Sequence, residues 1–341
     1  MATVRRRRRQ LPLTALLGLA AAAVVGCGDD SKPDAGAGGG SGAGGEASAL
    51  DPTAYLPTSA YDCTATGPFE PPERPYPAGC FADVACSARL ITAHRIATPF
   101  APENSLSALR AAILLGVDIV ETDVQLTADG EVVFIHDGDV DRTFDGTGAV
   151  SSLTLAEFRA MPMHVPPGLP AADFSCERAP TLDEMFGLAA GRVVIDLDVK
   201  DAQAGVQTAE YMRDHGLYGD AYLLCSPDEC AAIRAAVPDA PIMSRPQQAS
   251  QVAEEILYDP PPVMVHVDVS DPFLASAIVD SIHGVGAKVF ANGMATADIE
   301  ARLGGRLEAY GELFDRGLDV QQVENPHLAL VGLGRLDPPG Q

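Results

Sequence analysis

Basic residues are scarce in this sequence, and their scarcity excludes one large class of partner. Lys and Arg number 23 against 47 Asp and Glu, and five of the 23 are the consecutive arginines at positions 5–9. Without residues 1–26 the chain keeps 18 basic residues against 47 acidic ones, a net charge of about −29. Nucleic-acid binding needs a basic surface, which is missing here. We therefore expect no nucleic-acid partner, and an anionic substrate would need a local cation.

The sequence also lacks an apolar run long enough for a comfortable membrane span. Its N-terminal apolar run, residues 11–25, follows the arginines and ends at Gly26-Cys27. A basic start, a short apolar run and a small residue before the cleavage point are typical of a secretory signal peptide. A Cys after that small residue resembles a bacterial lipobox. We expect residues 1–26 to be the signal peptide and Cys27 to be lipidated, in an exported lipoprotein anchored to the cell envelope. An ordinary signal peptide, giving a periplasmic or secreted protein, is the alternative.

Residues 27–49 are mostly Gly, Ser, Ala and Asp and predict a flexible tether. An irregular, Cys- and Pro-rich lead-in follows over residues 50–88, and we expect disulfides to pin it. Seven cysteines fit an oxidising compartment, because six remain for up to three disulfides if Cys27 carries lipid. Cys225 and Cys230 are close enough to pair locally. The other four cysteines are Cys63, Cys80, Cys86 and Cys176. Three pairings are possible among them, and the alternative is that some of these thiols are unpaired.

Short β-rich runs alternate with amphipathic stretches from about residue 90, and we expect a catalytic domain over residues 89–335. The expected strands are residues 90–93, 118–124, 192–199, 221–225, 241–244, 262–268, 287–291 and 318–323. Eight such repeats predict a TIM (β/α)8 barrel. A doubly wound sheet is the alternative, but the sequence lacks the Gly-rich first turn that this fold prefers.

One further β-rich run, residues 131–135, follows the second strand after only the short loop Thr127-Ala128-Asp129-Gly130. Four residues cannot form a parallel crossover, and Asp129-Gly130 is a hairpin signal. We therefore expect a β-hairpin excursion after strand two, which brings His136 over the mouth of the barrel.

Acidic side chains gather on the strands that we expect to be second and third. Glu121 and Asp123 are two residues apart, as are Asp196 and Asp198, so each pair shares one face of its strand. Inward-facing carboxylates repel one another unless a cation joins them. Oxygen ligands suit a hard ion, so we expect one Ca²⁺ or Mg²⁺ on Glu121, Asp123 and Asp198. Structural salt bridges at the barrel mouth are the alternative.

Four stretches in order, "AHR…PENS", "ETDVQLTADGEVVFIHD", "DRTFDGTG" and "PTLDEMF", resemble the glycerophosphodiester phosphodiesterase family of phosphatidylinositol-phospholipase-C-like TIM barrels. The resemblance implies a metal on Glu121, Asp123 and an acid of the third strand. It also implies that His94 and His136 are the catalytic acid–base pair. Arg95 and Lys200 would then contact the substrate phosphate.

The sequence departs from the family pattern at several positions. Ile96 stands where the family usually has Gly, and Asp198 stands where it usually has Glu, with Asp196 as a rival ligand. The chain has no Trp, and Phe290 and Asn292 occupy the region of the usual one. The last strand ends in Val-Glu-Asn-Pro at residues 323–326 rather than in Thr-Asp before Pro.

Two assignments remain open between structure and function. Glu103 could orient a histidine or bind substrate, while Asn104 could cap the first helix. His266 could line the substrate site from the sixth strand.

We expect a monomeric enzyme that hydrolyses glycerophosphodiesters, or lyso-lipid headgroup diesters, with one divalent cation and two histidines. The first alternative is a phospholipase-D-like transferase that releases a cyclic phosphate. The second is a catalytically retired barrel that only binds a phosphorylated ligand.

Overall fold

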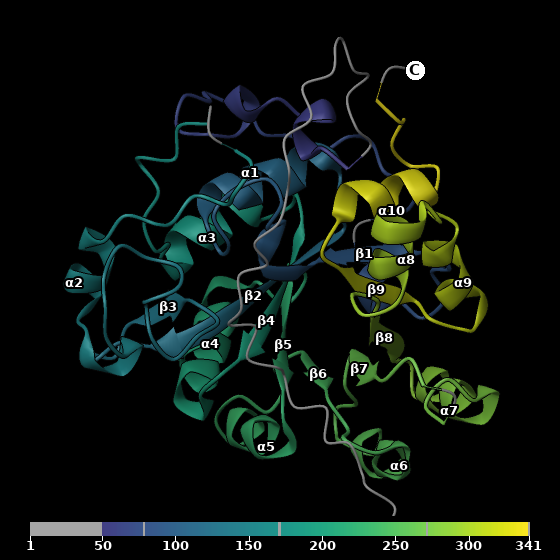
Figure 1. The fold of residues 1–341 in the computed structure, drawn as a ribbon. Helices are drawn as coiled ribbons and strands as arrows, with labels where there is room; N and C mark the ends of the chain where they lie inside the picture. The colour runs from purple at the N-terminus through teal and green to yellow at the C-terminus, as the bar shows by residue number, and fades with distance from the viewer. Residues whose placement is uncertain (1–49, 78, 170–171, 271, 340–341) are drawn as a thin grey trace, which may run out of the picture. The chain divides into compact units, whose positions relative to one another are not determined.

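The computed structural model describes residues 50–77, 79–169, 172–270 and 272–339. The expected signal peptide, Cys27 and tether therefore lie outside the described residues. Eight parallel strands form a closed barrel, because β1 pairs with β9 on one side and with β2 on the other (Figure 1). The prediction of a TIM barrel is confirmed. The barrel strands are β1 (Leu90–Ala93), β2 (Ile119–Leu126), β4 (Val194–Val199), β5 (Ala221–Cys225), β6 (Ile242–Ser244), β7 (Met264–Val267), β8 (Lys288–Asn292) and β9 (Val320–Val323).

The ninth strand of the sheet, β3 (Val132–Phe134), is not part of the barrel wall. It pairs antiparallel with β2, with Val124 opposite Phe134. The turn between them contains Gly130 at φ 82°, in the left-handed region that favours Gly. The expected hairpin excursion after strand two is confirmed.

Helices surround the barrel and follow its strands in turn (Figure 1). Several of them start at polar caps: Ser105 caps the first helix, and Thr154 and Thr181 form capping boxes with Glu157 and Glu184. Among the described residues, no helix is long and apolar enough to cross a bilayer. The helices are α1 (Leu106–Leu115), α2 (Leu155–Ala160), α3 (Leu182–Ala189), α4 (Ala202–His215), α5 (Pro227–Ala236), α6 (Val252–Glu255), α7 (Ser276–Gly284), α8 (Ala297–Gly304), α9 (Ala309–Asp315) and α10 (Pro326–Gly332).

The inside of the barrel changes from apolar to polar along the strands. Its apolar cluster includes Leu90, Ile119, Met243, Met264 and Phe290. Residues two positions further along a strand point to the same face. On most of the strands, the inward-facing positions near the C-terminal end are therefore polar. These C-terminal ends form the mouth of the barrel, where TIM barrels carry their active sites.

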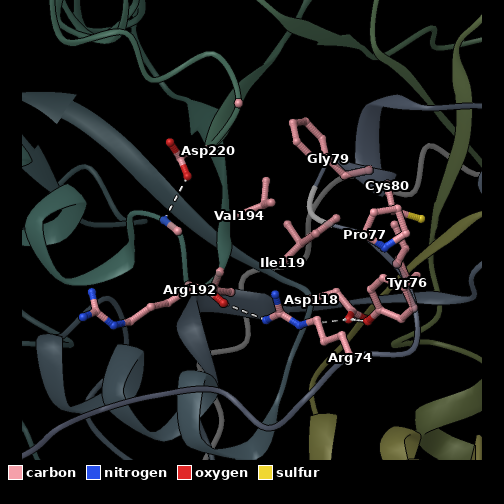
Figure 2. Close-up of a pocket in the computed structure, with 15 residues that line it drawn as sticks. Arg74, Tyr76, Pro77, Gly79, Cys80, Asp118, Ile119, Arg192, Val194 and Asp220 are labelled. Atoms are coloured by element: carbon pink, nitrogen blue, oxygen red, sulfur yellow. Dashed lines mark hydrogen bonds and ion pairs between the residues drawn. The ribbon is translucent and has the colours of Figure 1, made fainter.

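The lead-in closes the opposite, N-terminal end of the barrel. Phe81 stacks on the inward-facing Tyr222 with ring centroids 5.8 Å apart, and the fully buried Lys288 donates to the Cys86 carbonyl at 2.7 Å. Figure 2 shows a pocket here in which Arg74 and Tyr76 approach Asp118. Its volume of about 60 Å³ holds only a few water molecules. Because it lies at the end away from the mouth, this pocket is not the candidate active site.

Three disulfides use all six cysteines of the described chain. Cys225–Cys230 forms as expected from its spacing. The pairings that the sequence left open are Cys63–Cys176 and Cys80–Cys86. Cys63–Cys176 joins the lead-in to a segment 113 residues later and so fixes the lead-in to the catalytic domain.

Candidate active site

Three carboxylates meet at the mouth because of strand alternation and register. Glu121 and Asp123 both point inward from β2. In the parallel pairing of β2 with β4, Asp123 lies opposite Asp198. One oxygen from each of the three residues lies within 4.8 Å of the others. The structure thus brings together the three residues that the sequence suggests as metal ligands.

The charges of this cluster favour a cation. Burial raises the pKa of Glu121 well above its usual range, and the neighbouring charges of Asp123 and Asp198 raise it further. Lys200 supplies one positive charge, with its Nζ 3.0 Å from Asp123 and 2.7 Å from Asp198. One ammonium against three carboxylates leaves excess negative charge, and the donor atoms are all oxygens. The residues present therefore fit a divalent ion such as Mg²⁺ or Ca²⁺.

Asn104 orients one of these carboxylates. Its amide donates to Asp123 Oδ2 at 3.1 Å, and its Oδ1 accepts from the Thr122 hydroxyl at 2.9 Å. The helix cap at this point is instead Ser105, whose side chain accepts from the Ala108 N–H. Of the uses that the sequence left open for Asn104, capping of the first helix is therefore excluded. A polar side chain at a helix start can cap the helix or bind another group. Here the Asn104 amide binds the buried carboxylate of Asp123.

Asp196, the rival third ligand, lies one layer deeper in the barrel, opposite Glu121 in the register. It is fully buried, and it does not belong to the group of oxygens that Asp198 joins. Burial raises its pKa well above the usual range, and the charge of Glu121 raises it further. Asp196 therefore lies beneath the site and outside the proposed ligand group.

His94 is held by a carboxylate from the last strand. Its Nδ1 lies 2.6 Å from Glu324 Oε1, and its Nε2 lies 4.0 Å from Glu121 Oε2. The Thr98 hydroxyl donates to the second oxygen of Glu324 at 3.2 Å. Because a carboxylate only accepts, Nδ1 carries the hydrogen and Nε2 faces the acidic cluster.

His136 has the same arrangement on the hairpin side. Its Nδ1 lies 2.9 Å from Asp137 Oδ1, and Arg142 Nε donates to the other oxygen of Asp137 at 2.6 Å. Burial acts to raise the pKa of Asp137, but hydrogen bonds from Arg142 and His136 lower it to about 2. Burial acts to raise the pKa of Asp123, but the charges of Lys200 and then of His136 lower it. His136 therefore lies close enough to act on the carboxylate cluster.

Glu103 connects the first loop to the hairpin loop. Arg142 donates to its two oxygens at 2.7 and 2.8 Å, and Arg95 Nη1 lies 3.4 Å from one of them. Glu103 contacts neither histidine. Its place in the structure is between the two arginines, so its effect on a substrate would pass through Arg95.

The loop after β1 has a strained backbone. Arg95, Ile96 and Ala97 have φ values of 46°, 60° and 63°, and this region is uncommon for residues with a Cβ. The conformation points the Arg95 N–H at Glu121, to which it donates at 2.8 Å. Ile96 replaces the usual Gly and is fully buried in an apolar cluster, so burial of its side chain offsets part of the strain.

Arg245 is a mouth residue that the sequence analysis missed. It follows β6 and shares the inward face of Met243. Its charge acts on Asp198 and on His266, whose pKa is lowered to about 3 mainly by burial. Among the described residues, no hydrogen-bond or ion-pair partner exists for its guanidinium. Arg245 comes two residues after the inward-facing Met243, and this alternation along β6 could have predicted its position.

A closed parallel barrel with an acidic cluster, two carboxylate-bound histidines and cations at its C-terminal mouth defines a TIM-barrel protein with an enzyme-like site. The model of the glycerophosphoryl diester phosphodiesterase family matches residues 94–296. This range includes the three clustered carboxylates and both histidines, though not Glu324, and the chain belongs to this family.

The similarity to individual proteins is partial in sequence and broad in fold. A glycerophosphodiester phosphodiesterase of Caldanaerobacter subterraneus subsp. tengcongensis is 40% identical over 112 residues, 33% of this chain and 45% of that protein. The chain thus spans less than half the length of this curated relative. A solved glycerophosphodiester phosphodiesterase from Agrobacterium tumefaciens has a TM-score of 0.60 at 22% identity, covering 71% of this chain and 98% of that one. A phosphodiesterase from Oleispira antarctica, solved with the product sn-glycerol-3-phosphate, has a TM-score of 0.58 at 24% identity, covering 74% and 99%.

Proposed function

We propose that the protein hydrolyses glycerophosphodiesters with one bound divalent cation. The observation that carries the proposal is the group of Glu121, Asp123 and Asp198 oxygens within 4.8 Å of one another, with His94 and His136 beside it. Membership of the family and the solved relative that binds sn-glycerol-3-phosphate support the same substrate class.

The three carboxylates would hold the cation, Ca²⁺ or Mg²⁺. When bound, such an ion would neutralise the carboxylates and polarise a phosphoryl oxygen of the substrate. A phosphodiester is already anionic and gains charge in the transition state. Arg95 and Arg245 are the mouth cations placed to stabilise that charge, whereas Lys200 is paired with Asp123 and Asp198.

The two histidines would move the protons of the reaction. One imidazole is neutral and accepts a proton from the attacking hydroxyl through Nε2, and the other is an imidazolium and donates its Nε2 proton to the leaving alcohol. Glu324 and Asp137 fix the ring orientations through Nδ1. In this reaction one phosphorus–oxygen bond to the alcohol breaks, and one forms to water or to a neighbouring hydroxyl of the substrate.

We also propose that the protein works outside the cytoplasm, as a lipoprotein attached through Cys27. The three disulfides support an oxidising compartment, because such bonds are rare where thiols are kept reduced.

Replacing Glu121 by Gln tests the metal proposal. The change removes a negative charge from the ligand group and keeps the shape of the side chain. We expect metal affinity and turnover both to fall by tenfold or more, measured by calorimetric titration of Ca²⁺ and Mg²⁺ and by release of phosphomonoester. Glu300→Gln, on the exposed face of α8, is the control. Unchanged metal affinity in Glu121→Gln would overturn the assignment of this ligand.

A further inference from the structure

A buried carboxylate that the proposed mechanism does not use lies in the first turn of α8. Asp298 is 2% exposed. Its helix neighbours Ala297 and Ala301 belong to an apolar cluster to which α9, β9 and α10 also contribute. These elements lie close together in Figure 1. A carboxylate in such surroundings is costly unless hydrogen bonds compensate for its burial, so its partners are informative.

The hydrogen bonds of Asp298 lead to the segment that joins β9 to α10. The backbone N–H of Glu324 donates to its Oδ2 at 2.6 Å. The backbone and side-chain N–H groups of Asn325 donate to its Oδ1 at 3.3 and 3.2 Å. Glu324 and Asn325 are the two residues between the end of β9 and the start of α10. The carboxylate therefore fixes the backbone of this short segment.

Tyr310 holds the carboxylate in turn. It comes from α9, is fully buried, and its hydroxyl donates to Asp298 Oδ1 at 2.6 Å. Burial raises the pKa of Asp298, while hydrogen bonds from Tyr310, Glu324 and Asn325 act to lower it. The donors thus favour the ionised carboxylate, which only accepts.

The segment that Asp298 fixes carries the partner of a catalytic histidine. Glu324 Oε1 lies 2.6 Å from His94 Nδ1. The Glu324 side chain is partly exposed, and its second oxygen accepts from the Thr98 hydroxyl at 3.2 Å. Because hydrogen bonds weaken steeply when they are misaligned, the backbone position of Glu324 determines how well it can orient the His94 ring.

We propose that Asp298 is a positioning residue for the reaction, which acts on His94 through the backbone of Glu324. The inference rests on the proposed function, in which His94 moves a proton. A misplacement of about 1 Å far from the chemistry can cost about 10²-fold in rate, so a residue two contacts away from the reacting atoms can matter for turnover.

Asp298→Asn tests this role, because it keeps the size of the side chain but turns an amide donor toward one set of N–H groups. We expect kcat on glycerophosphocholine to fall by about 10–100-fold. KM and metal affinity should stay within about twofold, because the phosphate-binding cations and the carboxylate cluster are unchanged. Tyr310→Phe keeps the packing and removes one hydrogen bond, so it should cause a smaller loss of kcat. Normal kcat in both variants would overturn the proposal.

Asp118→Asn is the matched control for a merely structural effect. Asp118 is also a buried carboxylate, 4% exposed, and it accepts the backbone N–H of Ile91 at 2.7 Å. It lies at the opposite, N-terminal end of the barrel. Asp298→Asn and Asp118→Asn should both lower the free energy of unfolding in urea, and only Asp298→Asn should lower kcat. Equal losses of kcat would show that Asp298 only stabilises the fold.

The Glu324→Gln background tests the route through Glu324. If Asp298 acts through this residue, Asp298→Asn should lower kcat much less in Glu324→Gln than in the unsubstituted protein. The same fold-loss in both backgrounds would overturn the route.

Proton NMR tests the positioning without turnover. The short, charge-assisted hydrogen bond from His94 Nδ1 to Glu324 should give a low-field resonance, which His94→Ala assigns by removing it. We expect Asp298→Asn to shift this resonance and Asp118→Asn to leave it in place. If no diester is hydrolysed, a shifted resonance would keep the positioning role and reject the phosphodiesterase. An unchanged resonance in Asp298→Asn would reject the positioning role whatever the activity.

Discussion

At the scale of single residues, the site consists of two imidazoles whose Nδ1 atoms are both bound by carboxylates. His94 is 2.6 Å from Glu324, and His136 is 2.9 Å from Asp137. The two carboxylates are held in turn by Thr98 and Arg142. Both rings therefore hold the hydrogen on Nδ1, which leaves Nε2 as the nitrogen that can exchange a proton with the substrate.

His136→Ala should reduce turnover by about 10²–10⁴-fold, the usual contribution of one acid–base group. Metal affinity should stay largely intact, because His136 is outside the ligand group. His94→Ala is the matched variant, and both are assayed on a natural diester and on one with a nitrophenol leaving group. A good leaving group needs no proton, so it should rescue only the variant that lacks the acid. Full activity of His136→Ala on every diester would contradict the mechanism.

Arg245→Gln should lower kcat/KM by about 10–100-fold if the guanidinium binds the phosphate, since hydrogen bonds to charged groups contribute about 1.5–3 kcal/mol. Arg245→Lys should recover part of the loss because it keeps the charge. Arg213→Gln, an exposed change on α4, controls for the general effect of removing a cation. The three variants are compared by steady-state kinetics, and a normal kcat/KM in Arg245→Gln would remove this residue from the site.

The site residues that lie on one strand or one short turn could be predicted from the sequence. The contacts between residues that only the closure of the barrel brings together could not. Glu121, Asp123 and Asp198 follow from alternation along two strands. Glu324 is 230 residues from His94, and only the pairing of β9 with β1 brings them together. Sequence reasoning noted Glu324 as a departure from the family pattern but had no spacing by which to join it to His94.

At the scale of elements, the lead-in and α10 enclose a buried histidine. His327 is fully buried, with ring centroids 5.1 Å from Tyr55 and 5.4 Å from Phe100. Burial lowers its pKa from 6.5 to about 4, against smaller opposing effects of Asp51 and the Leu50 backbone. Between about pH 6.5 and pH 4, His327 is therefore protonated in the unfolded chain but not in the folded chain.

The free energy of unfolding should consequently fall as the pH decreases from about 6.5 to 4, with no contribution from His327 above that window. The full effect is about 3 kcal/mol. His327→Phe should remove this part of the pH dependence, and His215→Gln on the surface of α4 should not. Urea unfolding at several pH values measures it. An unchanged pH slope in His327→Phe would show that the ring accepts a proton in the folded state.

The strands could be predicted from the sequence because each one is a short β-rich run bounded by loop residues. The hairpin was readable because four residues permit no other connection. The lead-in had no repeating pattern, so its contacts could not be foreseen. Its role becomes visible only where Phe81 stacks on Tyr222 inside the barrel.

At the scale of the whole molecule, a strongly acidic chain places a few cations at the mouth of one barrel. Lys200 pairs with two of the clustered carboxylates, and the remaining negative charge there fits a divalent ion. With that ion bound, the mouth would attract an anionic substrate, whereas the net charge of the chain opposes one.

Phosphorus NMR of glycerophosphocholine incubated with the mature protein tests the central claim most directly. The protein is first stripped with a chelator, and Ca²⁺ or Mg²⁺ is then added in excess. We predict that the diester resonance stays constant in chelator and is replaced by a phosphomonoester resonance after the ion is added. A cyclic-phosphate resonance would instead identify the transferase reaction. Full consumption of the diester in excess chelator, or none with either ion, would contradict the account.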